Sequence, residues 1–361
     1  MNMNMKATAS PATLLLRFCL SLLAACLLAG CSEWNETEPL ELKVKGAKER
    51  APELWTRYME VLRDYKNSSH FLTYARFDNG AEKPVNEGGY LRSLPDSLDI
   101  VTLAHPDRLT GFDREDIPSL QEKSTKVLFL VDYAGMAETE LGDVSRLGAY
   151  LDKITGLAAE LGLDGFAFTC NPLYSGTDAE IAARKEAAAL IVSRLSSAAG
   201  ASGTLVFEGL PEALEPSDIA KLSLLVAPTA DLDNVVDLKL MMAGILYAPG
   251  ISKDKVLLSA SIGGEMADGN NVKKSQVPLI MDYVASLGPL GGLAIRGIGD
   301  DYYNSAMNYA VTRSVIRTMN PSREPIKNKR HENEIHNHNY PPDARPLRRR
   351  VHRMRGGVDR P

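Results

Sequence analysis

Residues 161–172 read LGLDGFAFTCNP, and they contain the most informative strand of the chain. The run Leu163–Phe168 is short, apolar and rich in aromatic residues, which is typical of a buried strand. A stretch with helical spacing, Ala137–Leu161, precedes this run, and a second one, Asp178–Ala199, follows it. An apolar strand between two helices indicates a parallel sheet that is covered on both faces.

The same alternation of strand, loop and helix extends along the chain in both directions. The short apolar runs are Phe71–Phe77, Ile100–Ala104, Val127–Val131, Leu163–Phe168, Thr204–Phe207, Leu222–Ala227, Val256–Ser259 and Gly292–Ile295. An amphipathic helix, Pro52–Lys66, is predicted before the first of them. No Gly-x-Gly-x-x-Gly turn follows the first run, which argues against an open nucleotide-binding sheet. Eight such units over roughly 250 residues predict a single α/β domain at residues 51–321, a (β/α)8 TIM barrel.

Composition and charge narrow the possible functions. The chain has 361 residues, 44% of them hydrophobic, and a net charge of −5, which excludes wholesale disorder and a polytopic membrane protein. Residues from Arg323 to Pro361 carry a net charge of +6, so the rest of the chain carries −11. An acidic body does not suit phosphate-backbone binding, and no nucleic-acid partner is expected. The segment 322–361 lacks apolar periodicity and is predicted to be a disordered, basic tail.

The amino terminus is predicted to be a targeting signal. The apolar run Phe18–Gly30 is too short for a comfortable membrane span. It ends in Leu28-Ala29-Gly30-Cys31, the lipobox pattern, which implies cleavage before Cys31 and lipidation of its thiol. We therefore assign residues 1–30 to a lipoprotein signal peptide and residues 31–50 to an acidic tether. The tether resembles surface-export signals of Gram-negative glycan-foraging bacteria, so a lipid anchor in the outer membrane, facing outward, is expected.

Functional side chains of such a barrel are expected where the strands end, at the carboxyl face. Small-ligand sites of this kind join aromatic rings, which stack on apolar faces of a ligand, to fixed polar groups that hydrogen-bond it. The residues of these types that we predict to bind a ligand are Tyr74, Asp78, Asp132, Tyr133, Asn171, Glu208 and Tyr302. Single residues at such positions more often cap loops. The prediction therefore depends on whether the fold brings them together.

The strand quoted above also resembles the signature strand of glycoside hydrolase family 18, in which Asp-Gly-x-Asp-x-Asp-x-Glu ends the fourth strand of a barrel. Asp164 and Gly165 match the first two positions, but Ala167, Thr169 and Asn171 stand where the family places Asp, Asp and Glu. In the family, the Glu protonates the glycosidic oxygen and the neighbouring Asp orients the acetamido group of the sugar. Asn171 cannot titrate and Thr169 supplies no carboxylate, so the resemblance implies a site without catalytic residues.

The resemblance covers about Ser32 to Pro321. The matching segments are the Trp34 region, Arg63–Lys66, Tyr74–Asp78, Leu94–Ile100, Lys126–Tyr133, Tyr302–Asn304 and Met319–Pro321. Together they are similar to the lipoprotein branch of the family that is found in polysaccharide-utilisation systems. In that branch some members are endo-β-N-acetylglucosaminidases that cut the chitobiose core of N-glycans, and others are non-catalytic.

We interpret the chain as a catalytically inactive barrel that binds an N-glycan or another GlcNAc-containing oligosaccharide at the cell surface. It would hold this ligand for neighbouring enzymes and for a starch-utilisation-type outer-membrane transporter. Two alternatives stay open: an active glycosidase with displaced carboxylates, such as Asp132 with Glu208 or Glu265, and a structural or adhesin-like barrel. No cofactor is expected, and no metal either, because His336 and His338 lie in a charged tail without a cysteine.

Overall fold

The computed structural model describes residues 46–321. The predicted signal peptide, the lipidation site Cys31, most of the tether and the basic tail lie outside the described residues. The chain divides into two compact units at Arg57 and Tyr58. The first unit contains α2 (Ala47–Arg50) and the start of α3 (Pro52–Asn67), and the second contains the strands listed next.

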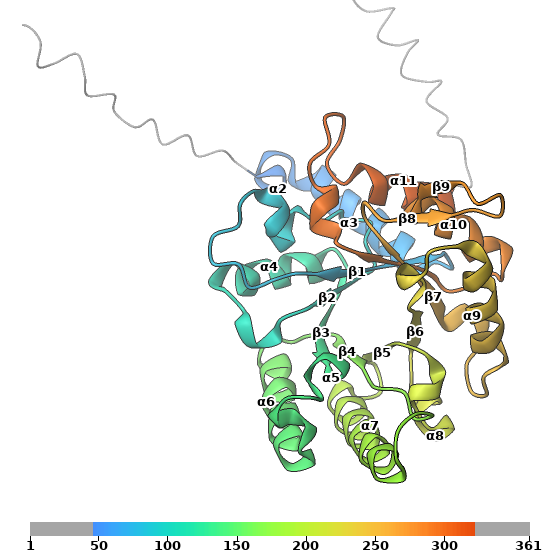
Figure 1. The fold of residues 1–361 in the computed structure, drawn as a ribbon. Coiled ribbons are helices and arrows are strands. Elements are labelled where there is room, and N and C mark those ends of the chain that lie inside the picture. The colour runs from blue at the N-terminus through green and yellow to red at the C-terminus, as the bar shows by residue number, and fades with distance from the viewer. Residues whose placement is uncertain (1–45, 322–361) are drawn as a thin grey trace, which may run out of the picture. The chain divides into compact units, whose positions relative to one another are not determined.

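Eight parallel strands of the second unit close into a barrel in chain order (Figure 1). They are β1 (Leu72–Phe77), β2 (Ile100–Leu103), β3 (Lys126–Asp132), β4 (Gly165–Thr169), β5 (Thr204–Glu208), β6 (Leu224–Ala227), β7 (Val256–Ser261) and β10 (Gly292–Arg296). β10 pairs with β1 and closes the ring. A separate antiparallel hairpin, β8 (Glu265–Ala267) and β9 (Lys273–Ser275), follows β7. The predicted (β/α)8 barrel is confirmed, and each of the eight apolar runs contains or overlaps one barrel strand.

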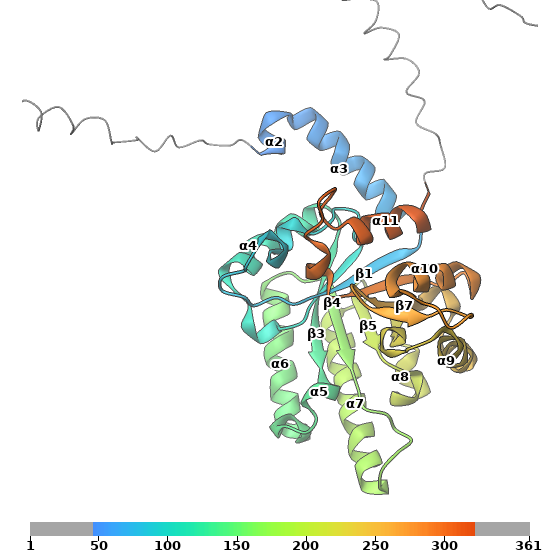
Figure 2. The ribbon, with the colours of Figure 1, turned by 45° about the horizontal axis from the view of Figure 1, so that its top comes forward.

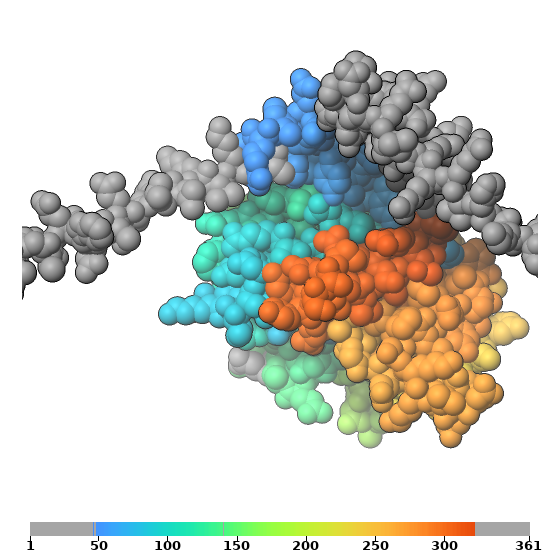
Figure 3. Space-filling model, turned by 90° about the horizontal axis from the view of Figure 1, so that it is seen from above, coloured from blue at the N-terminus to red at the C-terminus, as the bar shows by residue number. Residues whose placement is uncertain are grey.

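Helices surround the strands on the outside of the barrel. They are α4 (Gly111–Glu122), α5 (Tyr133–Met136), α6 (Val144–Glu160), α7 (Asp178–Ala199), α8 (Pro216–Ile219), α9 (Val235–Tyr247), α10 (Gln276–Ser286) and α11 (Ala310–Met319). Short 3₁₀ turns lie between several of them, among them η1 (Glu87–Gly89), η2 (Leu91–Ser93), η4 (Glu140–Gly142) and η8 (Ile298–Asp301). Figure 2 shows α6 and α7 alongside β3, β4 and β5, and Figure 3 shows η8 and α11, in red-orange, between the cyan and the orange segments. Within residues 46–321, no helix has the length and apolar character that a membrane span requires.

Two predicted helices illustrate how capping residues set helix ends. The prediction Asp178–Ala199 agrees with α7, which begins after Thr177, whose side chain forms a capping box with Glu180. The predicted helix Ala137–Leu161 begins too early, because α5 and η4 occupy the segment before α6. The Asp143 side chain accepts hydrogen bonds from the first backbone N–H groups of α6 and fixes its start.

The strands are apolar on both faces because both faces are buried. Outward-facing residues pack against the helices in one large core. Inward-facing residues fill the barrel itself, and they include Tyr74, Ile100, Leu128, Leu130, Ala167, Val206, Val226, Leu257 and Ala294. Since side chains alternate along a strand, the next inward positions after these layers lie at the carboxyl ends of the strands. Polar residues occupy most of those positions, as described below.

At the amino end of the barrel, where the strands begin, a buried carboxylate ties β1 to the segment before β2. Asp99 Oδ2 accepts a hydrogen bond from the backbone N–H of Thr73 at 2.8 Å. Its other oxygen lies 2.9 Å from Nε2 of His70, whose Nδ1 lies 2.7 Å from the carbonyl of Ser68. Both side chains of the Asp99–His70 pair are almost fully buried. These contacts fix the amino end of β1, the first strand of the barrel.

Segments that are distant in sequence contact one another at the amino end of the barrel. Lys66 Nζ donates hydrogen bonds to the carbonyl of Leu98 and to Thr125 Oγ1. The Asn320 side chain accepts a hydrogen bond from the backbone N–H of Phe71 and donates one to its carbonyl. The matched segments Arg63–Lys66, Leu94–Ile100 and Met319–Pro321 therefore meet at the amino end, where they support the fold.

Candidate functional site

The carboxyl ends of the strands form the mouth of the barrel, and a polar group of side chains lies on its floor. Arg76 of β1 lies between two carboxylates, with Nη2 3.4 Å from Asp132 Oδ2 and Nη1 3.8 Å from Glu208 Oε2. Asp132 ends β3 and Glu208 ends β5. Thr169, which ends β4, donates its hydroxyl to Asp132 Oδ1 at 2.7 Å and accepts a hydrogen bond from the backbone N–H of Ala134.

Tyr74 lies on the same strand as Arg76, two residues earlier, and supports the floor from inside the barrel. Its hydroxyl donates to Glu208 Oε1 at 2.5 Å, and both residues are buried. Burial and then the charge of Glu208 raise the pKa of Tyr74 well above its usual value, so its hydroxyl stays protonated and donating. We call the connected group of Tyr74, Arg76, Asp132, Thr169 and Glu208 the floor cluster.

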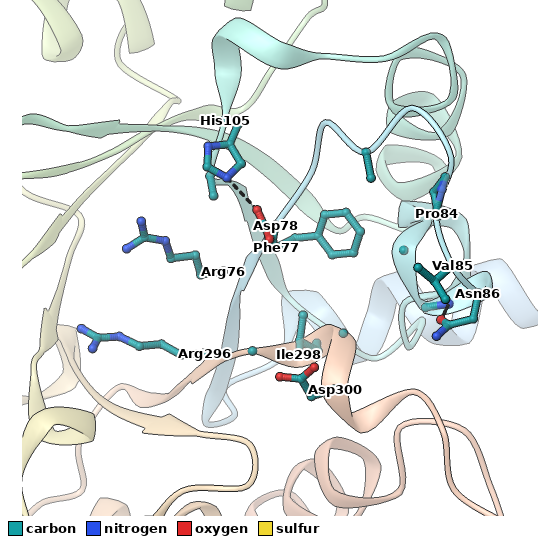
Figure 4. A pocket seen from close by; sticks show the side chains of 16 residues that line it. Arg76, Phe77, Asp78, Pro84, Val85, Asn86, His105, Arg296, Ile298 and Asp300 are labelled. Carbon is teal, nitrogen blue, oxygen red and sulfur yellow. Dashed lines mark hydrogen bonds and ion pairs between the residues drawn. The ribbon is translucent and has the colours of Figure 1, made fainter. Parts of the chain in front are cut away.

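A cavity of about 740 Å³ opens at the ends of β1, β2 and β10 (Figure 4). Its walls combine apolar and charged side chains, namely Arg76, Phe77, Asp78, Pro84, Val85, Asn86, His105, Arg296, Ile298 and Asp300. Asp78 Oδ1 lies 2.6 Å from His105 Nε2, and Figure 4 shows this pair at the cavity. Pockets with apolar walls and a few convergent polar groups are typical of small-ligand sites. The structure therefore brings Asp78 to a cavity that shares Arg76 with the floor cluster.

The three predicted aromatic residues lie in two different environments. The rings of Tyr74 and Tyr133 are covered by protein, since these residues are 1% and 5% exposed. Tyr302 is half-buried, and its ring meets that of Tyr309 edge-on with the centroids 5.5 Å apart. Tyr303, next in sequence, is 88% exposed. Of the predicted rings, Tyr302 therefore has the most surface open to a ligand. The Tyr74 hydroxyl instead donates its hydrogen bond to Glu208.

The two motif positions that match the family have structural contacts. Asp164 Oδ2 accepts hydrogen bonds from the backbone N–H of Val127 and from Gln121 Nε2, which ties β4 to β3 at the amino end. Gly165 adopts a φ of 145°, and a Cβ on it would lie 2.0 Å from the carbonyl oxygen of Thr204 in β5. Only glycine fits this close approach of two strands.

The three substituted motif positions point to the inside of the barrel or to its mouth. Ala167 is fully buried among the other inward side chains of the barrel. Thr169 belongs to the floor cluster. Asn171 lies just beyond β4 and is half-buried, and its side chain makes no hydrogen bond to any of the residues 46–321. The retained residues thus support the strand, whereas two of the changed residues, Thr169 and Asn171, lie at its carboxyl end.

Sequence reasoning missed Arg76, the residue that links Asp132 to Glu208. It lies inside an apolar run, FLTYARF, and a strand is only recognised as facing inward or outward once the barrel is closed. The signal that could have found it is the period of two from Tyr74 to Arg76 along the strand. Arg296 ends β10 in the same way, with Nη1 2.7 Å from Asp231 Oδ1.

The described residues hold no group of three His, Cys, Asp or Glu side chains that could bind a metal ion. Cys170 is a free, buried cysteine, and burial raises the pKa of its thiol to about 12, which disfavours the nucleophilic thiolate. The polar groups described at the mouth are arginine, carboxylate and hydroxyl groups.

Comparisons with known proteins agree with this architecture. BT1044, solved as a substituted selenomethionine protein, aligns with a TM-score of 0.58 at 18% identity, over 77% of this chain and 96% of that one. An endo-β-N-acetylglucosaminidase from Cordyceps militaris in apo form gives 0.57 at 18% identity, over 73% and 96%. A chitinase from Bacteroides thetaiotaomicron gives 0.52 at 12% identity, over 70% and 98%. At these identities the likeness establishes the fold.

Sequence comparison establishes the family. None of the curated proteins matches the chain. The family model described as glycoside hydrolase family 18, BT1044-like, matches residues 36–255, which is more than half of the chain and contains β1 to β6. The match includes the degenerate motif strand and every member of the floor cluster. The chain therefore belongs to glycoside hydrolase family 18, in its BT1044-like group.

Proposed function

We propose that the barrel binds an oligosaccharide of the N-glycan or GlcNAc-containing class at its mouth and does not hydrolyse it by the family mechanism. The observation that carries this proposal is the pair Thr169 and Asn171 at the motif positions of the family's Asp and Glu. Asn171 has no titrating group that could protonate a glycosidic oxygen. Loss of a positioned general acid alone costs about 10²–10⁴-fold in rate.

The contacts of the floor cluster support binding in place of catalysis. Asp132 accepts the hydroxyl of Thr169, and Glu208 accepts the hydroxyl of Tyr74. Arg76 contacts both carboxylates, so each is already engaged by donor groups. Such a fixed network is suited to hydrogen-bonding sugar hydroxyls, because its donors and acceptors are held in place before the ligand arrives.

A second candidate is an active glycosidase that uses displaced carboxylates. The observation in its favour is that Asp132 and Glu208 lie on the same floor, on either side of Arg76. Glycosidases use two carboxyl groups that face each other across the bond to be cut. Glu265, the other carboxylate that we considered, belongs to the β8–β9 hairpin and lies 3.7 Å from Lys273 Nζ, outside the floor cluster.

The test measures binding and release on the same samples. The purified protein is incubated with N-glycoproteins and chito-oligosaccharides, with equilibrium binding followed by calorimetry and released reducing sugar followed chemically. We expect saturable binding without release, and a loss of affinity in Arg76→Gln. Arg194→Gln serves as the control, because Arg194 lies on α7 in an exposed pair with Asp152.

Two other results would change the proposal. Release that survives Asn171→Ala but disappears in Asp132→Asn or Glu208→Gln would establish the active glycosidase. Neither binding nor release over a broad panel would favour a structural or adhesin-like barrel. Thermal unfolding of each variant would show that it is folded.

We also propose that the protein is anchored to the outer membrane through Cys31, and that it passes its ligand to a starch-utilisation-type transporter. The support is the lipobox Leu28–Cys31 and the acidic tether that follows it. In cells, Cys31→Ala is expected to abolish labelling by fatty acid and to move the protein out of the membrane fraction. Labelling and fractionation unchanged by Cys31→Ala would overturn the anchor.

A further inference from the structure

Two arginines from neighbouring strands lie at the same level of the mouth. β1 and β10 are paired with Ala75 aligned to Ile295, so the next residues, Arg76 and Arg296, follow at one level. Both line the cavity of about 740 Å³. Figure 4 shows their side chains extending in the same direction, away from the segment Pro84–Asn86. Side chains of the two arginines are 30% and 29% exposed, so they are held by the protein and open to a ligand.

Each guanidinium has donors that its protein partners do not use. Arg76 reaches Asp132 and Glu208 only at 3.4 and 3.8 Å, which is at or beyond the limit of a good hydrogen bond. Arg296 uses Nη1 for Asp231, while its buried Nε has no hydrogen-bond partner. A buried donor left unpaired is costly, and guanidinium forks bind carboxylates and similar anions in two-point fashion. Because the Arg296 Nε lies inside the protein, the donors left for an anion are the terminal Nη groups of the two arginines.

The acidic groups nearby do not occupy all of these donors. Asp78 is paired with His105 at 2.6 Å. Asp231 holds one edge of Arg296 and is itself 63% exposed. Asp78 and Asp300 both line the cavity and oppose an anion, and Asp300, near Gly297, has no ion pair among the described residues. Removing the Asp300 charge should therefore have the opposite effect on anion binding to removing an arginine.

We propose that Arg76 and Arg296 form a subsite for an anionic sugar, one that carries a carboxylate or a sulfate group, within the bound oligosaccharide. This inference rests on the proposed glycan-binding function and specifies its ligand class. The anionic group accepts hydrogen bonds from the two guanidinium forks. Of the apolar residues that line the cavity, Pro84 and Val85 have surface open to the sugar ring, whereas Phe77 and Ile298 are buried. Affinity for such a ligand falls with added salt, because part of it is ionic.

The experiment compares three matched oligosaccharides that differ only at one sugar: neutral, carboxylated and sulfated. Equilibrium binding to the full protein is measured at low and high salt. We expect at least one anionic form to bind about tenfold or more tightly than the neutral form at low salt. Arg296→Gln abolishes this preference, Asp300→Asn increases it, and Arg194→Gln leaves it unchanged. Melting curves of each variant confirm that it is folded.

The outcomes separate this inference from the proposed function. Preference for the carboxylated or for the sulfated form supports the subsite and identifies the anion. Equal binding of all three forms, unchanged in Arg296→Gln, overturns the subsite while glycan binding stands. Binding of none of the three, nor of any other sugar in the panel, overturns the proposed function and the subsite with it. A preference for the anionic form together with sugar release supports the subsite but contradicts the proposal that the barrel does not hydrolyse its ligand.

Discussion

The two ends of the barrel use polar residues in different ways. At the amino end, Asp99 is buried and bonded to the backbone of Thr73 and to His70. At the mouth, Arg76 has long contacts and Arg296 keeps an unpaired Nε. In barrels of this type the amino end supports stability and the carboxyl end carries function. Substitutions at the amino end should therefore lower stability, and substitutions at the mouth should mainly weaken ligand binding.

The largest expected effect is a loss of stability, caused by a substitution at the amino end of β4. Gly165→Ala would place a Cβ 2.0 Å from the Thr204 carbonyl at a φ of 145°. Overpacking and backbone strain together should cost more than about 3 kcal/mol of unfolding free energy. Urea unfolding measures it, with Gly156→Ala in α6 as the control. Gly156 has open space around its Cα and should gain about 0.5–1 kcal/mol on becoming alanine.

A second prediction compares one carboxylate from each end. Asp99→Ala leaves the backbone N–H of Thr73 and the His70 ring without their buried partner, which should cost about 3 kcal/mol. Asp132→Ala removes a side chain that is 39% exposed, and should cost about 1 kcal/mol or less. Only Asp132→Ala should weaken glycan binding. Equal stability losses, or equal effects on binding, would remove the distinction between the two ends.

The third prediction concerns the support of the floor cluster. Tyr74→Phe removes the hydroxyl that Glu208 accepts, at a stability cost of about 1–2 kcal/mol. Because Glu208 then loses its fixed position, we also expect weaker glycan binding with no new sugar release. Calorimetric titration and thermal unfolding of the same preparation measure both. An unchanged affinity would show that Glu208 is not part of the binding floor.

The smallest expected effect is a pH dependence that comes from the amino end. The hydrogen bond to Asp99 raises the pKa of His70 above its usual 6.5, so the folded state binds the proton more tightly than the unfolded chain. The stabilisation is fully present below pH 6.5 and is lost as the pH rises through the higher folded pKa. Urea unfolding between pH 5 and 8 should show this decline, and His70→Gln should flatten it. Stability that rises over this range through His70 would contradict the assignment.

Much of the fold could be predicted from the sequence, because apolar strands and capped helices are local signals. The sequence predicts the helix Asp178–Ala199 with its observed limits, and in the structure Thr177 caps its start and Gly200 its end. The helix before β4 was predicted too long, because the apolar spacing does not show that Asp143 starts a new helix. Capping geometry decides between one long helix and several short ones.

The site was less predictable, because it is assembled from strand ends far apart in the chain. Asp132 and Glu208 were predicted from their places after apolar runs, and the structure brings them together around Arg76. Arg76 was missed because its inward orientation depends on closure of the barrel. Tyr133 was predicted as a platform, yet it begins α5 and its ring packs in the core. A residue's distance from a strand end does not specify which way its side chain points.

The most direct test of the central claim, that the mouth holds a glycan without cutting it, is a single-turnover experiment. Protein in excess over a GlcNAc-containing oligosaccharide, at a concentration well above the measured Kd, keeps nearly all of the ligand bound, and new reducing ends are then followed for many hours. The account predicts complete binding and intact oligosaccharide. Reducing ends that form in proportion to bound ligand, and that vanish in Glu208→Gln, would contradict it.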